Sequence, residues 1–136
     1  MSHTCHNLLI HCMDFRLQAD IQNWAKEQGI EGDFDRVSVA GAGAAILAED
    51  SRAYLEKHAE LSQKLHSAKR VIIMNHTDCG AYGGHSAFQG ENEEEQKHVS
   101  DMKKAAALIQ TRWPELEIQL VLIKMTEEGN KFEIVS

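Results

Sequence analysis

The chain has 136 residues, of which 43% are hydrophobic and 26% are charged, and its formal net charge is −7. This length suits a single domain over residues 1–136, and at this size folding buries roughly 68% of the unfolded surface, so no disulfide or metal is required for stability. The acidic balance argues against nucleic acid as a partner. No apolar run approaches the ~18 residues of a membrane span and no signal-peptide pattern opens the chain, so we expect a cytoplasmic protein.

Short apolar runs alternate with longer segments of helical spacing, a pattern that predicts an α/β fold. The first predicted strand covers residues 8–10. Leu17, Ile21 and Trp24 follow at helical spacing, and Gly29 ends that segment. The segment therefore has the pattern of a crossover helix.

A second predicted strand, residues 37–40, leads into the glycine-containing stretch 41–46. This stretch begins like a dinucleotide-binding fingerprint, but Ile46 stands where the third glycine or alanine belongs. We therefore interpret it as a tight turn that enters a helix. Residues at helical spacing from Leu47 to Leu65 predict one long helix after the turn.

The third predicted strand covers residues 71–74, and a short helix is expected to begin near Gly80. The next helix ends before Pro114, the only proline, and has the clearest apolar stripe of the chain: Val99, Met102, Ala106, Ile109 and Trp113. The glutamates at its start, residues 91 and 93–95, suit a helix N-terminus, and we interpret them as a solvated face without a functional role.

A fourth predicted strand covers residues 120–123, and Gly129-Asn130 predicts a two-residue turn into an antiparallel edge strand, residues 131–135. The other four runs are almost continuously apolar, which indicates strands covered on both faces. We predict an open, mainly parallel sheet of order 2-1-3-4 with this antiparallel edge strand, covered by helices on both faces. In this order the carboxyl ends of the first and third strands meet at the switch point, where such sheets bind ligands.

The three cysteines are too few, and odd in number, for a disulfide framework, so metal binding or catalysis explains them better. Cys12 follows the first predicted strand, and His76 and Cys79 follow the third. Two thiolates and an imidazole suit zinc, and three protein ligands leave a fourth position for water or substrate, as in a catalytic site. Cys5 is expected to be a bystander.

Asp14 and Arg16 lie two and four residues after Cys12. If residues 12–16 continue the strand, these three side chains project from the same face, and the charged pair shares a pocket with the metal ligand. A phosphatase loop is a weaker interpretation, because that signature needs five residues between its Cys and Arg and this chain has three.

Two motifs at these positions resemble those of the β-class carbonic anhydrases: Cys-x-Asp-x-Arg, as Cys12-Met13-Asp14-Phe15-Arg16, and His-x-x-Cys-Gly, as His76-Thr77-Asp78-Cys79-Gly80. Between them, residues 40–41 match the Ala-Gly that ends a strand of that family, whereas Ser38 and Val39 replace its Arg and Asn. The resemblance covers most of residues 8–85 in order and in predicted topology.

The resemblance implies reversible hydration of CO₂ to bicarbonate by a zinc-bound hydroxide, with one Zn²⁺ per chain held by Cys12, His76 and Cys79. It also implies catalytic roles for Asp14 and Arg16. The Asp either pairs with the Arg and orients the zinc-bound water, or swings to the fourth position and closes the site. CO₂ and bicarbonate are the expected small-molecule partners, and a homodimer or larger homo-oligomer is the expected assembly.

Other interpretations stay open at this point. The zinc could be structural, with Asp14 as a permanent fourth ligand, in a non-catalytic or regulatory homologue. The same site could instead hydrolyse a CO₂ analogue such as COS or CS₂. His85 could shuttle protons or be a surface loop residue. The histidines near Cys5 could bind adventitious metal, whereas His58 and His66 are expected to be ordinary helix residues.

Overall fold

The sheet has five strands in residues 3–136, the part of the chain that the structure, a computed structural model, describes. The strands are β1 (Asn7–His11), β2 (Phe34–Ser38), β3 (Arg70–His76), β4 (Glu117–Thr126) and β5 (Gly129–Ile134). They lie in the order β2-β1-β3-β4-β5, and neighbours are parallel except for the antiparallel pair β4 and β5. The predicted α/β class, the order 2-1-3-4 and the antiparallel edge strand are therefore confirmed.

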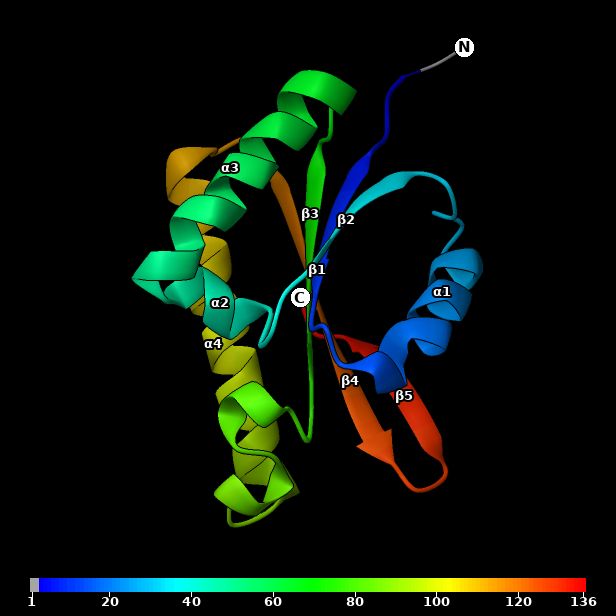
Figure 1. Cartoon of the computed structure of the whole chain (residues 1–136), viewed down its shortest axis with the longest axis vertical. Helices are drawn as coiled ribbons and strands as arrows, with labels where there is room; N and C mark the ends of the chain where they lie inside the picture. Colours follow the sequence, from blue (N-terminus) through cyan, green and yellow to red (C-terminus); the bar gives the residue numbers. More distant parts are fainter. Residues whose placement is uncertain (1–2) are drawn as a thin grey trace.

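Helices cover both faces of the sheet, as expected (Figure 1). One face carries α1 (Gln18–Glu27), and the other carries α2 (Gly43–Leu47), α3 (Glu49–His66) and α4 (Glu91–Arg112). Short 3-10 helices lie in the loops: η1 (Phe15–Leu17), η2 (Gly80–Tyr82) and η3 (His85–Ala87). Within residues 3–136, no helix combines the length and the apolar character needed to cross a membrane.

The core has two layers, one on each face of the sheet, because successive strand residues point to opposite faces. In β1, Leu8 and Ile10 pack with residues of α2, α3 and α4, whereas Leu9 packs with residues of α1. In β3, Ile73 and Ile72 divide between the layers in the same way. Burial on both faces explains why these strands are continuous apolar runs in the sequence.

Several boundaries differ from the predictions. β3 and β4 extend beyond the predicted runs 71–74 and 120–123, and three further differences have identifiable causes. β2 begins three residues before the predicted strand 37–40, because an edge strand tolerates polar residues that hide its start. The predicted helix 47–65 is divided into α2 and α3 by Ala48, whose backbone is extended (φ −79°, ψ 128°). The turn before β5 is formed by residues 127–128, and Gly129 (φ 123°) already pairs with Thr126 in the ladder.

Candidate metal centre

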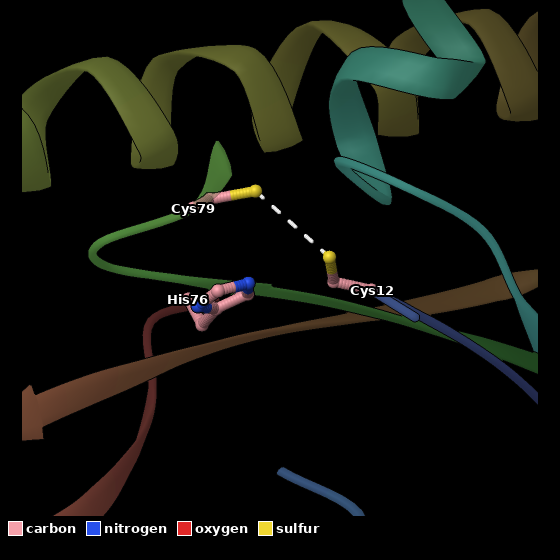
Figure 2. Close-up of side chains that lie close together, drawn as sticks. All are labelled: Cys12, His76 and Cys79. Atoms are coloured by element: carbon pink, nitrogen blue, oxygen red, sulfur yellow. Dashed lines mark hydrogen bonds between the residues drawn. The ribbon is translucent and has the colours of Figure 1, made fainter. Parts of the chain in front are cut away.

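Three potential metal ligands converge at the carboxyl ends of β1 and β3 (Figure 2). Cys12 directly follows β1, His76 is the last residue of β3, and Cys79 lies three residues further on. Their ligand atoms lie within 4.8 Å of one another, and all three residues are buried. The two Sγ atoms are 3.9 Å apart. Two sulfurs bound at about 2.3 Å to one tetrahedral zinc ion would be ~3.8 Å apart, so the observed separation fits zinc.

The hydrogen bonds of the His76 ring leave one of its nitrogens for a metal. Nδ1 lies 2.6 Å from the Thr77 carbonyl oxygen, which can only accept, so Nδ1 carries the proton. Nε2 is buried and has no hydrogen-bond partner among residues 3–136. Burying a polar atom without a partner costs free energy, and metal-binding histidines typically donate their other N–H to a carbonyl or carboxylate. Both features fit His76 as a metal ligand.

The two cysteines form a hydrogen-bonded pair at the centre of the site. The hydrogen bond between their sulfurs lowers the pKa of Cys12 and raises that of Cys79, so Cys12 is the residue that holds the negative charge. Backbone amides of the surrounding loops also donate toward the sulfurs: those of Gly41 and Asp14 help to lower the pKa of Cys12, and those of Ala81 and Tyr82 oppose part of the rise in the pKa of Cys79. These donors favour the thiolate, which is the form that binds metals.

Residues 12–16 do not continue β1, so the prediction that strand alternation aligns Cys12, Asp14 and Arg16 is wrong. The Asp14 side chain accepts a hydrogen bond from the Arg16 backbone N–H at 2.9 Å and caps η1, which bends the chain away from the sheet. Asp14 nevertheless lies beside the ligands, because its Oδ2 is 3.9 Å from Nε2 of His76. The capped turn, and not strand alternation, therefore places Asp14 beside the metal ligands.

The Arg16 guanidinium joins the loop after β1 to the loop after β3. It donates to both oxygens of Asp14, at 2.6 Å for the shortest contact, and to the side chain and carbonyl of Asp78 at 3.1 and 3.0 Å. Hydrogen bonds from Arg16 lower the pKa of Asp14 to about 2, so this carboxylate is ionised at neutral pH. The His85 backbone N–H, and then Arg16, lower the pKa of Asp78.

Glu94 holds the loop that carries Cys79 from the α4 side. It is 1% exposed, and its carboxylate accepts a hydrogen bond from the Asp78 backbone N–H at 2.7 Å and lies 2.6 Å from Nδ1 of His85. The interpretation of the acidic run as a solvated face is therefore wrong for Glu94, because α4 begins against this loop. The proton-shuttle role of His85 stays a prediction.

A buried polar network that was not predicted lies between β3 and α4. Asn75 is at its centre: its Oδ1 accepts from the Gly43 backbone N–H at 2.8 Å, and its Nδ2 lies 3.2 Å from Oη of Tyr82 and 3.0 Å from Nδ1 of His98. The Tyr82 hydroxyl in turn donates to Asp101 at 2.8 Å. The network holds two segments near the candidate ligands in place. One is the turn that enters α2, and the other is the short helix η2, which directly follows Cys79.

A cavity of about 770 Å³ opens beside the ligands. It is lined by Cys12, Met13, Asp14, Phe15, Arg16, Ala40, Asp78, Gly80, Ala81, Gly83 and Gly84. Phe15 and Met13 are 81% and 66% exposed, so the entrance is partly apolar. Of the three candidate ligands only Cys12 lines this cavity, together with Asp14 and Arg16.

A family model described as "Putative carbonic anhydrase" matches residues 2–134 of the chain. A curated protein of Rickettsia bellii (strain RML369-C), described as uncharacterized, is 33% identical over 122 residues. That match covers 85% of this chain and 74% of the relative.

Carbonic anhydrases are also among the solved structures with the same fold. The carbonic anhydrase from Glaciozyma antarctica matches with a TM-score of 0.61 at 19% identity, over 97% of this chain and 83% of that chain. β-Carbonic anhydrase isoform I from Trichomonas vaginalis matches with a TM-score of 0.64 at 16% identity, over 98% of this chain and 84% of that chain. At these identities the likeness shows a shared α/β fold.

Proposed function

The chain belongs to the family described as "Putative carbonic anhydrase", as a divergent member with the β-carbonic anhydrase fold, and on this premise we propose that it is a zinc-dependent carbonic anhydrase. In this proposal Cys12, His76 and Cys79 bind one Zn²⁺, and the reaction is the reversible hydration of CO₂ to bicarbonate. The observation that carries the proposal is the preassembled ligand set: two sulfurs at a zinc-like separation and a buried imidazole nitrogen without a partner among residues 3–136.

The proposed reaction needs an activated water that is correctly oriented. A zinc ion bound by these ligands supplies the activation, because it lowers the pKa of a coordinated water to about 7. In hydration, the water oxygen bonds to the carbon of CO₂, one C=O electron pair moves to oxygen, and the water loses a proton to solvent buffer. Asp14 accepts a hydrogen bond from the attacking water and so orients its lone pair. With a pKa of about 2 it holds no proton at neutral pH, so its role is orientation.

Arg16 keeps Asp14 available for this role. Its contacts with both carboxylate oxygens hold Asp14 in the turn, so the carboxylate would not be free to bind the metal. Two thiolates also donate more charge to a metal than imidazoles do, which reduces its acidity, and a nearby guanidinium offsets part of that charge. In this proposal Cys12, His76 and Cys79 would be the only protein ligands, which would distinguish the site from a structural one with Asp14 as permanent ligand.

The proposed active form is at least a homodimer. Phe15 and Met13 are large apolar side chains that stand exposed at the entrance of the cavity. Exposed apolar groups of this kind mark interaction surfaces when they lie together. A second copy placed over them would bury apolar surface and narrow the route to the ligands.

Ligand identity is tested most cleanly in a Cys5→Ser chain, in which Cys12 and Cys79 are the only cysteines. This chain should bind one zinc ion, and adding Cys12→Ser, His76→Ala or Cys79→Ser should abolish binding, as measured by metal analysis after dialysis. Adding His6→Ala, which removes an exposed imidazole outside the ligand set, should leave binding unchanged. Full zinc occupancy after Cys79→Ser would contradict the assignment.

A further inference from the structure

A second group of metal-ligating side chains lies at the other end of β1. Cys5 precedes β1, Asp35 is the second residue of β2, and His66 is the last residue of α3. Because β1 and β2 are parallel, Cys5 and Asp35 are at the amino ends of their strands, opposite the end where Cys12 lies. The five residues of β1 separate the two groups by about 16 Å. The second group therefore cannot contribute to the first site.

The side chains of Cys5, Asp35 and His66 lie close enough together to hold one metal ion. One ligand atom from each residue lies within 4.8 Å of the other two, and all three side chains are half-buried. Nδ1 of His66 is 2.7 Å from Oδ2 of Asp35. The Cys5 sulfur has a long contact of 3.5 Å with the Asn7 carbonyl and a hydrogen bond with Asp35. Burial and the Asp35 carboxylate raise the pKa of Cys5, so a bound metal ion would replace the thiol proton.

The backbone and a neighbouring hydroxyl hold this group in place. The Cys5 N–H donates to the His66 carbonyl at 2.9 Å, which fixes the N-terminal segment to the end of α3. The Ser62 hydroxyl donates to Oδ2 of Asp35 at 2.7 Å and orients the carboxylate. Such hydrogen bonds to ligands are a regular feature of metal sites. The three donors therefore come from three separate segments of the chain, and these hydrogen bonds connect the segments without a metal.

The donor types select the class of metal. A thiolate is a soft ligand that excludes Mg²⁺ and Ca²⁺ in favour of zinc and its neighbours, and imidazole and carboxylate are also zinc ligands. The ring of His3 lies 4.9 Å, centre to centre, from the ring of His66 and is a candidate for the fourth position. We propose that Cys5, Asp35 and His66 form a second site for a divalent transition metal ion, Zn²⁺ by its donors, that fastens the N-terminal segment to β2 and α3.

The proposal is tested with a Cys12→Ser/Cys79→Ser chain, in which Cys5 is the only thiol. Titration with Co²⁺ should produce a thiolate-to-cobalt charge-transfer band in the near ultraviolet that saturates at one ion per chain. His66→Gln in this chain should abolish the band. His6→Gln should keep it, because His6 neighbours Cys5 in sequence but is not among the three donors. A band that is absent, or that is insensitive to His66→Gln, would overturn the proposal.

The natural chain provides a second measurement, since replacing Cys12 and Cys79 alters a buried site. The natural chain should bind two zinc ions, and Cys5→Ser should bind one and hydrate CO₂ at the natural rate. Equal zinc content in the two chains would refute the second site without touching the first. A natural chain that binds two zinc ions but does not accelerate CO₂ hydration would refute the proposed function and leave the second site unaffected.

Discussion

Arg16 determines where the Asp14 carboxylate lies, so removing either side chain should impair CO₂ hydration for a different reason. Without the guanidinium, Asp14 is free to turn to the fourth ligand position, so Arg16→Ala should keep zinc but lose CO₂ hydration. Without the carboxylate, the water is no longer oriented, so Asp14→Ala should keep zinc and lose roughly 10²–10⁴-fold in rate. Metal analysis and stopped-flow assays on the same preparations would check both outcomes.

Arg112→Ala is the matched control for Arg16→Ala. Arg112 also pairs with two carboxylates, those of Glu56 and Glu60, but it lies at the last turn of α4 and does not line the cavity. This variant should hydrate CO₂ at the natural rate. Near-normal hydration by Arg16→Ala would mean that the contact with Asp14 is only a structural salt bridge.

Glu94 should affect metal affinity without touching the metal. Glu94→Gln removes the charge and one of the two acceptors that hold the Asp78 N–H and His85. Loss of such a supporting contact should weaken zinc binding by roughly 10–100-fold. Competition with a chelator would measure the change, and Glu91→Gln, at an exposed position of the same helix turn, should leave the affinity as it is. Equal zinc affinity in both variants would mean that Glu94 contributes only to the packing of α4.

Sequence motifs were sufficient to group the five predicted site residues: Cys12, Asp14, Arg16, His76 and Cys79. They sufficed because a parallel order that places β1 beside β3 also places the loops after them side by side. Motifs were not sufficient for Glu94, because a glutamate run at a helix N-terminus has the same composition whether it faces solvent or a loop. Its burial depends on the path of residues 77–90, which no local pattern specifies.

Among the helices, α4 buries a polar stripe next to its apolar one. Glu94, His98 and Asp101 have the spacing i, i+4, i+7, and all three are buried against the loop and the end of β3. The spacing is visible in the sequence, but a polar stripe on an amphipathic helix ordinarily faces water. The folded chain gives each of the three a partner inside: the Asp78 N–H for Glu94, Asn75 for His98 and Tyr82 for Asp101.

Burial of His98 gives a pH dependence of stability with a definite sign. Burial lowers the pKa of His98 from 6.5 to about 4, an effect larger than the opposing attraction of Glu94 and Asp101. Between these pH values His98 is protonated in the unfolded chain but stays neutral in the native chain. The free energy of unfolding therefore decreases as pH falls, by up to about 3 kcal/mol. Above pH 6.5 this contribution does not change.

The test is urea unfolding of the natural chain and of His98→Gln between pH 7 and pH 4. Both chains lose stability as other groups titrate and as bound metal is released, so the informative quantity is the difference between them. The natural chain should lose more stability than the variant over this range. Parallel losses in the two chains would show that His98 is not held neutral.

The strands show which elements a sequence reveals. The strands at residues 8–10 and 71–74 were recognised because both faces of β1 and β3 are covered, which makes the runs apolar throughout. The start of β2 was missed because an edge strand carries polar residues such as Asp35 and Arg36. The break at Ala48 was missed because alanine has high helix propensity, so nothing local marks the change of direction.

At the scale of the whole molecule, the exposed residues beside the cavity predict how the chain associates. Phe15→Glu places a charge where the proposed partner copy would bury an apolar ring, so the variant should be monomeric at micromolar concentration and the natural chain at least dimeric. Light scattering would report both masses. Leu65→Glu is the control, because Leu65 is 60% exposed on α3, away from the cavity. A natural chain that is monomeric and active would contradict the proposed assembly.

Stopped-flow measurement with the zinc-loaded chain tests whether Cys12, His76 and Cys79 bind a zinc ion that enables CO₂ hydration. The natural chain should accelerate hydration well above the buffer rate, and the acceleration should disappear on chelation and return with added zinc. Cys79→Ser should be inactive under all three conditions. Hydration at the buffer rate by a chain whose zinc content has been verified would contradict the claim and favour a non-catalytic zinc-binding protein or a different substrate.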